Sequence, residues 1–334
     1  KPNTRQAKNV ILFVGDGMDI TTTTAARIFD GQSRNEEGEE NFLSFERFPF
    51  VALSKTYNTN AQTPDSAGTM SAMTTGVKTK IGVIALTDAA PVGDCASSKS
   101  AIAPTLGELA ERAGLSTGVV TTTRLTHATP AAVYAHAADR DWERDTNLPE
   151  EAKANGCADI ARQLIEFADG DGIDLAMGGG RANFLPVEAA DPEAPETTGG
   201  RRDGRDLTGE WRAKGPSHVY IWDREGFDAI DVQAGPRVLA LFEPSHMNFE
   251  ADRAADNCRD DGEGCRDPSS EQKWLLPDGR RRAHRSRPSR RKRRARPQGH
   301  ASLQRSGRKG DLDDECERHA CHRHGGSRSH NVDG

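Results

Sequence analysis

The sequence predicts an α/β protein, a three-layer sandwich around a largely parallel central sheet. Two observations predict this class: short uninterrupted apolar runs are typical of strands buried on both faces, and helical segments alternate with those runs. The pattern stops near Asp267, so the carboxyl-terminal part of the fold is expected to be missing or scrambled. We therefore expect an incomplete α/β domain over residues 1–270 and a basic, low-complexity tail, disordered or out of frame, over residues 271–334.

The predicted elements follow one another in a regular order. The first strand is expected in NVILFVGDGMD, residues 9–19, and a helix is expected after TPDSAG with Ser66 in its first turn. TLGELAERAG has helical spacing and ends in Gly114, and STGVVTTT follows it as a strand. ADIARQLIEFA and GIDLAMGGG repeat this order of helix and strand. SHVYIWD and RVLALFEP are expected to form two further strands.

The formal net charge of −6 conceals two unlike parts of the chain. Residues 274–310 hold 14 Lys/Arg and one acid, whereas the rest of the chain holds 31 Lys/Arg against 50 Asp/Glu. The acidic body repels nucleic-acid phosphates and is also typical of salt-adapted, halophilic proteins. The basic stretch keeps one alternative open, a nucleic-acid-binding protein acting non-specifically through residues 279–309, although no aromatic residue there could stack on bases.

Cysteine usage and hydropathy favour an exported protein without a membrane span. Cys258 and Cys265 lie in one polar loop, DNCRDDGEGCRD, and are candidates for a short disulfide. The total of six cysteines is even, which fits an oxidising compartment. No apolar run approaches the roughly 20 residues that span a bilayer. A chain that opens at Lys1 without Met fits a processed mature form, periplasmic or extracellular.

Polar residues with catalytic potential follow the predicted strands and the helix start. Asp16 stands between two glycines directly after the first predicted strand, where a carboxylate can ligate a cation, although Asp-Gly is also a common turn. Ser66 would lie in the positive field of a helix amino terminus, which favours attack on an anionic substrate, unless it is an ordinary N-cap.

A third group of polar residues lies in TTTRLTHATPAAVYAHAADRDWE. Arg140 carries a guanidinium suited to bidentate phosphate binding, and the hydroxyl of Thr129 can join an octahedral magnesium shell. His127 stands two residues before Thr129. Taken singly, each of the three residues is equally consistent with an ordinary polar residue of a loop or a helix surface.

Taken together and in order, these motifs resemble the alkaline phosphatase family. The resemblance rests on ILFVGDGM, TPDSAGTMSAMTTGVKT and HATPAAVYAHAADR. It continues through CADIARQLI, DLAMGGGR, RRDGRDL and LFEPSHMNFEADRA, and it covers nearly all of residues 8–269. It implies hydrolysis of phosphate monoesters to inorganic phosphate through a phosphoserine, in a site with two zinc ions and one magnesium ion.

The resemblance also assigns roles to the matching residues. It makes Ser66 the nucleophile and Arg140 the residue that holds the phosphate oxygens. Asp16 would bridge a zinc ion and the magnesium ion, Thr129 would ligate magnesium, and His127 lies near the magnesium shell where other members have Asp. One zinc ion would activate Ser66 and a second would activate water to cleave the phosphoenzyme.

Features outside the site follow from the resemblance as well. Cys95 and Cys157 match a disulfide pair of animal-type members, which supports export to the periplasm or the extracellular space. Glu243 and Asp267 fall where some members bind calcium. Members of the family are often homodimers, so a homodimer is expected.

The zinc-binding part of the family pattern breaks off in this sequence. Most zinc ligands of the family lie in a Val-Glu-Gly-Gly-Arg-Ile-Asp-His-x-His-His segment, a Thr-Ala-Asp-His-x-His segment and a more distant His, and none of these motifs is present. Synonymous codons for residues 274–289, read from their second base, permit Gly-Tyr-Tyr-Leu-Met-Val-Glu-Gly-Gly-Arg-Ile-Asp-His-Ala-His. The same shift over residues 316–330 permits Thr-Ala-Asp-His-Ala-His. We therefore hypothesise a frameshift near Gln272-Lys273, and we expect the chain as written to be defective in two-zinc catalysis.

Overall fold

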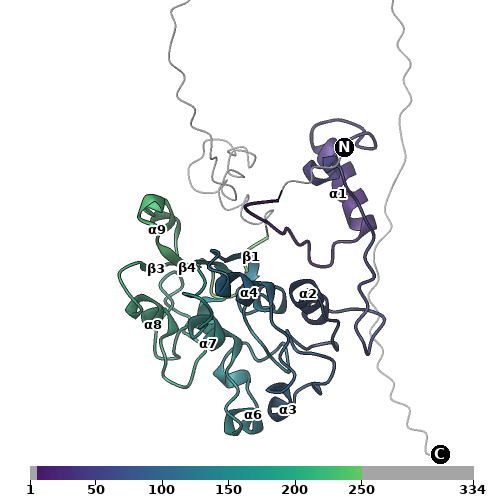
Figure 1. The fold of residues 1–334 in the computed structure, drawn as a ribbon. Helices are drawn as coiled ribbons and strands as arrows, with labels where there is room; N and C mark the ends of the chain where they lie inside the picture. The colour runs from purple at the N-terminus through teal and green to yellow at the C-terminus, as the bar shows by residue number, and fades with distance from the viewer. Residues whose placement is uncertain (1–5, 250–334) are drawn as a thin grey trace, which may run out of the picture. The chain divides into compact units, whose positions relative to one another are not determined.

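The computed structural model describes residues 6–249, and its centre is one parallel sheet of four strands (Figure 1). The strands are ordered β1-β2-β4-β3, and all neighbouring pairs are parallel. In the register of the sheet, Ala176 pairs with Val119 on one side and Leu239 on the other. The strands are β1 Gly118–Arg124, β2 Leu175–Gly179, β3 His218–Ile221 and β4 Arg237–Leu241. The α/β class and the parallel sheet predicted from the sequence are confirmed.

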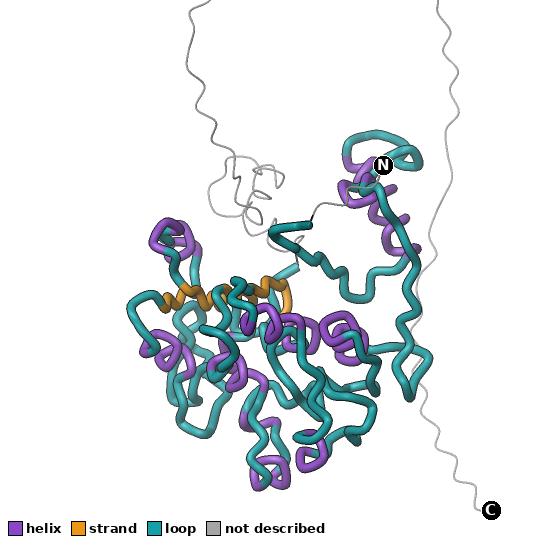
Figure 2. The backbone as a smooth tube through the Cα atoms, in the orientation of Figure 1, coloured by secondary structure: helices purple, strands orange, loops and turns teal. Residues whose placement is uncertain are grey.

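Helices and loops carry most of the chain between the strands (Figure 2). Among the described residues, the α-helices are α1 Ile20–Ser33, α2 Ser66–Thr75, α3 Cys95–Ser98, α4 Leu106–Arg112, α5 Ala128–Ala131, α6 Glu150–Ala154, α7 Ile160–Ile165, α8 Leu207–Ala213 and α9 Arg224–Asp228. Short 3-10 helices are η1 Ser44–Arg47, η2 Asp145–Asn147, η3 Arg181–Asn183 and η4 Val232–Ala234. None of the helices in this part of the chain is long and apolar enough to cross a membrane.

One face of the sheet lies against the main core, and the other is covered beside β3 and β4 but open at β1, where Val120 is 50 % exposed. On one face, Ala176, Leu239 and Leu241 join the main core, to which helices α7 and α8 contribute Ile160, Leu164, Ile165, Leu207 and Trp211. On the other face, Val238 and Ala240 belong to a separate cluster with Ile221, Phe227 and Phe242, and α9 lies on that side (Figure 1). The sheet is therefore the middle layer of three.

Local capping signals in the sequence determine where helices begin. The hydroxyl of Thr105 accepts a hydrogen bond from the main-chain N–H of Glu108, whose carboxylate accepts in return from the N–H of Thr105. This reciprocal pair satisfies two N–H groups that a helix start leaves free, so α4 begins at Leu106 as the pattern predicts. Asp159 caps α7 in the same way through the N–H of Arg162.

The strand predicted in residues 9–19 is not formed, and that prediction was wrong. Residues 9–15 adopt no regular structure, and the side chains of Val10 and Phe13 are 86 % and 70 % exposed. The apolar run shows that this segment suits burial on both faces, but burial requires a neighbouring strand and a covering layer. Among residues 6–249, β1 is the edge of the sheet, and nothing pairs with it on its outer side.

Several predictions concern residues outside the part that the structure describes. These are the disulfide between Cys258 and Cys265, the calcium role of Asp267, and the basic stretch over residues 279–309. The division at residue 270 and the frameshift hypothesis lie there too. Within the described part, Cys95 and Cys157 form a disulfide, which links α3 to the segment after α6.

Two arginines are completely buried and neutralised by carboxylates. Arg201 contacts Asp159 at 2.9 Å, and the two side chains are 0 % and 2 % exposed. Arg181 contacts Asp191 at 2.7 Å in an equally buried pair. Removing one partner of such a pair leaves a charge without compensation in the interior, which is far more costly than losing a surface ion pair.

Replacing Asp159 by Ala is expected to lower the free energy of unfolding by about 3–5 kcal/mol, because Arg201 loses a buried partner and α7 loses its cap. Urea denaturation followed by circular dichroism measures the change. The control is Asp169→Ala, which breaks an ion pair with Arg112, a side chain that is 48 % exposed, and should alter stability little. Equal losses of unfolding free energy in the two variants would show that the buried pair contributes no more to stability than the surface pair.

Candidate active site

Three predicted site residues from distant parts of the sequence meet at the carboxylate of Asp16. The hydroxyl of Ser66 donates to both carboxylate oxygens of Asp16 at 2.9 Å. The hydroxyl of Thr129 donates to the same carboxylate at 2.8 Å. Asp16 precedes α1, Ser66 is the first residue of α2, and Thr129 lies in α5 after the carboxyl end of β1. The structure thus brings these three residues together.

The position of Ser66 is set by the residue before it. Asp65 caps α2 by accepting from the N–H of Gly68 at 3.0 Å, and it also accepts from the Asn58 amide at 2.8 Å and the N–H of Gly82 at 2.9 Å. A fourth donor is the guanidinium of Arg140 at 3.2 Å. Burial alone would raise the pKa of Asp65, but these four donors outweigh it and hold the pKa below its ordinary value. The carboxylate is therefore charged near neutral pH and fixes the helix start.

Close packing at this helix start requires glycine. A Cβ atom on Gly68 would lie 2.7 Å from the side-chain oxygen of Asn58, which is closer than real carbon atoms approach. The glycine therefore lets the Asn58 amide reach both the helix and Asp65. Gly76 ends the same helix with a φ of 75°, a left-handed conformation that favours glycine.

The remaining two predicted site residues, Arg140 and His127, also contact one another. The second guanidinium nitrogen of Arg140 lies 3.1 Å from Nε2 of His127. Burial, and next the positive charge of Arg140, lower the pKa of His127, so its ring is neutral near pH 7 and Nε2 can accept this hydrogen bond. Nδ1 of His127 is buried and has no partner in the structure. All five predicted residues therefore belong to one cluster, which we call the Asp16 cluster.

A second polar layer beside the Asp16 cluster was not predicted from the sequence. The guanidinium of Arg124, at the end of β1, binds Glu143 at 2.6 and 2.8 Å. Nδ1 of His246 accepts from the main-chain N–H of Arg124 at 3.3 Å, and its ring packs edge-on against His127 with centroids 5.5 Å apart. His246 falls within the motif LFEPSHMNFEADRA, which was the only signal that could have identified it.

Glu243, the described member of the predicted calcium pair, contacts residues of two loops that follow β2 and β4. It follows β4, and its main-chain oxygen accepts from the N–H groups of Gly180 and Arg181 at 2.9 and 3.0 Å. Its side chain accepts from the amide of Asn248 at 3.4 Å. These contacts join the end of β4 to the loop after β2, and the calcium role of Glu243 stays a prediction.

The chemistry of the Asp16 cluster is that of oxygen donors around one carboxylate. Asp16, Ser66 and Thr129 supply a carboxylate and two hydroxyls, which are the donors that magnesium takes in proteins. A zinc site needs three or four His, Cys, Asp or Glu ligands. Residues 6–249 contain no group of three such side chains placed to hold a metal ion. The described donor set therefore fits magnesium and does not fit zinc.

Comparison with known proteins places the chain in a family. The model of the alkaline phosphatase family matches residues 7–269. The chain belongs to the alkaline phosphatase family. The mouse (Mus musculus) alkaline phosphatase of the tissue-nonspecific isozyme is 46 % identical over 259 residues, which are 76 % of this chain and 49 % of the relative. The alkaline phosphatase of Gadus morhua is 44 % identical over 256 residues, 75 % of this chain and 53 % of the relative. The chain thus spans about half the length of the curated alkaline phosphatases it matches.

Solved alkaline phosphatases share the fold of the described domain. The cold-active alkaline phosphatase of Shewanella sp. aligns with a TM-score of 0.51 at 27 % identity, over 72 % of this chain and 47 % of that one. The Thermus thermophilus alkaline phosphatase aligns with a TM-score of 0.50 at 25 % identity, over 77 % of this chain and 43 % of that one. Both comparisons agree with the parallel α/β sheet described above.

Asp65→Ala is expected to destabilise the domain by clearly more than the loss of one helix cap, which costs about 1 kcal/mol. The reason is that three further donors lose their acceptor. The matched control is Asp223→Ala, because Asp223 caps α9 through the N–H of Gly226. Urea denaturation of both variants measures the difference. A loss no larger for Asp65 than for Asp223 would contradict the view that Asp65 joins four parts of the site.

Proposed function

We propose that the domain binds phosphate monoesters and transfers their phosphoryl group to Ser66. The observation that carries the proposal is the hydrogen bond from the Ser66 hydroxyl to Asp16 at the amino terminus of α2, a helix of 10 residues. A helix start offers free N–H groups and a positive field to a phosphate dianion. Family membership supports the same substrate class.

The proposed step starts with Ser66. Its oxygen forms a bond to phosphorus while the bond between phosphorus and the ester oxygen breaks, and the departing alkoxide takes up a proton from water. The proton of the Ser66 hydroxyl passes to the carboxylate of Asp16, to which it is already hydrogen-bonded. Attack of water on the phosphoserine then releases inorganic phosphate, and a proton of that water restores the hydroxyl of Ser66. Asp16 returns to the carboxylate form by giving its proton to the hydroxide that remained when the alkoxide was protonated.

Arg140 is proposed to balance the charge of the transferred phosphoryl group. Its guanidinium is held by the Asp65 carboxylate on one nitrogen and by neutral His127 on another. These two contacts orient the planar group before substrate binds, so little reorganisation is needed when a phosphate arrives. Because Asp65 precedes Ser66 directly, the nucleophile and the cation are positioned by one and the same carboxylate.

Magnesium is proposed as a metal of this site, held by Asp16 and Thr129 with the Ser66 hydroxyl beside them. When bound, it would neutralise part of the phosphate charge. The family resemblance also implies two zinc ions, but the described residues do not supply their ligands. We therefore derive no step through zinc, and we propose that turnover by the chain as written is slow.

Export, a homodimer and a frameshift are proposed as further properties. Export to the periplasm or the extracellular space is supported by the disulfide between Cys95 and Cys157, since disulfides persist in oxidising compartments. A homodimer is proposed on family resemblance. The frameshift near residue 272 also stays a proposal, and it can be tested by comparing the present chain with a version in the restored reading frame.

Ser66→Ala is expected to abolish the slow release of p-nitrophenol from p-nitrophenyl phosphate at alkaline pH, because the attacking oxygen is lost. Ser97→Ala is the matched control, since the Ser97 hydroxyl donates to Asp94 in a similar contact away from the site, and it should retain the parent rate. The version with the restored reading frame should be faster by orders of magnitude. Equal zinc-dependent rates in the present and restored chains would contradict the proposed defect, and full activity in Ser66→Ala would contradict the role of Ser66.

Titration calorimetry with magnesium chloride is expected to show binding that Asp16→Ala removes and Thr129→Val weakens about tenfold, because each change deletes an oxygen ligand. Thr146→Val removes a hydroxyl that accepts from Arg144 and should leave the affinity unchanged. Magnesium affinity that is the same in all four proteins would exclude the site around Asp16.

A further inference from the structure

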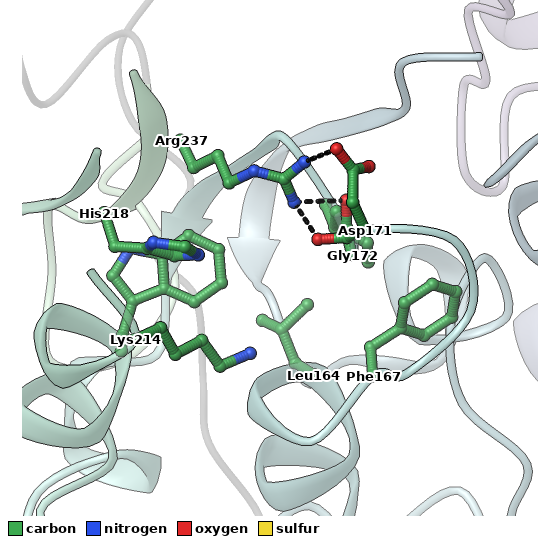
Figure 3. A pocket seen from close by; sticks show the side chains of 9 residues that line it. Leu164, Phe167, Asp171, Gly172, Lys214, His218 and Arg237 are labelled. Atoms are coloured by element: carbon green, nitrogen blue, oxygen red, sulfur yellow. Dashed lines mark hydrogen bonds and ion pairs between the residues drawn. The ribbon is translucent and has the colours of Figure 1, made fainter. Parts of the chain in front are cut away.

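A cavity of about 250 Å³ lies at the edge of the sheet opposite the Asp16 cluster (Figure 3). His218 and Arg237, the first residues of β3 and β4, line it, whereas the Asp16 cluster follows the last residues of β1. In a parallel sheet these two ends face opposite ways. The cavity is therefore separate from the proposed catalytic site, and the inference drawn from it goes beyond the proposed function.

The inner wall of the cavity is apolar and rigid. Leu164 of α7 and Trp211 of α8 line it and are 1 % and 2 % exposed, so both belong to the main core. Ile173 and Phe167 complete this wall. A wall made of core side chains cannot collapse into the space, because close packing on the far side holds each side chain in place.

Lys214 lines this cavity, and its amine takes part in no ion pair with the described residues. It follows α8 directly, and in Figure 3 its nitrogen points toward Leu164. Its nitrogen lies 5.2 Å from the centre of the Trp211 ring, and the charge of Glu166 attracts it without forming an ion pair. Burial, followed by repulsion from Arg237, lowers the pKa of Lys214. An ammonium in such a place gains by acquiring an anionic partner.

His218 adds an unsatisfied nitrogen on the same side. Its Nδ1 is buried and has no hydrogen-bond partner. The ring is held edge-on against Trp211 with centroids 4.9 Å apart, so Nδ1 cannot turn out to solvent without losing that contact. Burial lowers the pKa of His218, so the ring is neutral near pH 7. Because Nδ1 is buried, the ring acts as part of the cavity wall and its Nδ1 does not face the cavity.

Arg237, the remaining cation, is already neutralised. Its guanidinium contacts Asp171 at 2.5 Å and Asp174 at 3.3 Å, and it donates to the main-chain oxygen of Gly172 at 2.8 Å (Figure 3). It therefore forms a rigid side of the cavity. Lys214 is left as the group that can receive an anion.

We propose that this cavity binds a small carboxylate that carries a compact apolar body. The carboxylate would contact the amine of Lys214, and the apolar body would lie on Leu164 and Phe167. An apolar cavity of about 150 Å³ accepts benzene. A cavity of about 250 Å³ therefore has room for one ring and one carboxylate.

The test uses the full chain labelled with 5-fluorotryptophan and observed by fluorine NMR. The sequence has 4 tryptophans, so the spectrum is simple, and Trp211→Phe identifies the signal from the cavity. Benzoate is titrated as the probe, with benzamide as a neutral molecule of the same shape and inorganic phosphate as an anion without an apolar body. Benzoate is expected to shift the Trp211 signal saturably, with a Kd of about 1 mM or below.

Variants then connect binding to the amine of Lys214. Lys214→Met keeps the length of the side chain and should weaken benzoate at least tenfold, since a charge-assisted contact is lost. Lys214→Arg keeps the charge and should bind nearly as well as the parent. Lys153→Met, a lysine paired with Glu150 outside the cavity, is the control and should bind like the parent.

Each possible result either supports the proposal or overturns it. A saturable shift by benzoate that Lys214→Met weakens and Lys153→Met does not would support the proposal. Equal affinity for benzamide, tighter binding of phosphate than of benzoate, or no benzoate shift at about 10 mM would overturn it. Because the readout is binding at Trp211, neither loss nor retention of phosphatase activity affects this outcome.

Discussion

The Asp65 carboxylate is the contact on which the proposed catalytic site depends. It receives four hydrogen bonds, from the start of α2, from the loops at residues 58 and 82, and from Arg140. A carboxylate with so many donors has one orientation, and everything attached to those donors is fixed with it. Ser66 is half-buried and its hydroxyl contacts Asp16, so its place is given by its neighbour in the sequence. Ser66 is therefore positioned through Asp65, and its hydroxyl stays accessible to a substrate.

Sequence reasoning succeeded where the determining forces are local. The capping pair of Thr105 and Glu108 and the apolar run of β4 are each contained within a few residues, so helix α4 and the strand were predictable. The five members of the Asp16 cluster were predicted through motifs and a family resemblance. Their mutual contacts were not, because the hydrogen bond between Asp16 and Thr129 joins residues 113 positions apart.

The site residues that the sequence analysis missed are those whose contacts join positions far apart in the sequence. His246 is 122 positions away from Arg124, and neither residue carries a pattern that points to the other. The predicted strand at residues 9–19 failed for the converse reason. Its apolar composition suits burial on both faces, but none of the described strands pairs with it. An apolar run shows that a segment suits burial, but the segment forms a strand only when another strand pairs with it and a layer covers it.

The exposed run from Val10 to Val14 has a consequence for how this protein behaves in a cell. Five successive apolar residues without proline or charge, with main-chain groups unpaired to any described strand, offer a template to an identical segment of another molecule. The rate at which two copies pair rises with the square of the protein concentration, so the chain associates with itself mainly when it is abundant. The segment that carries Asp16 into the site is thus also the segment most apt to draw the chain into aggregates or to the chaperones that recognise extended apolar stretches.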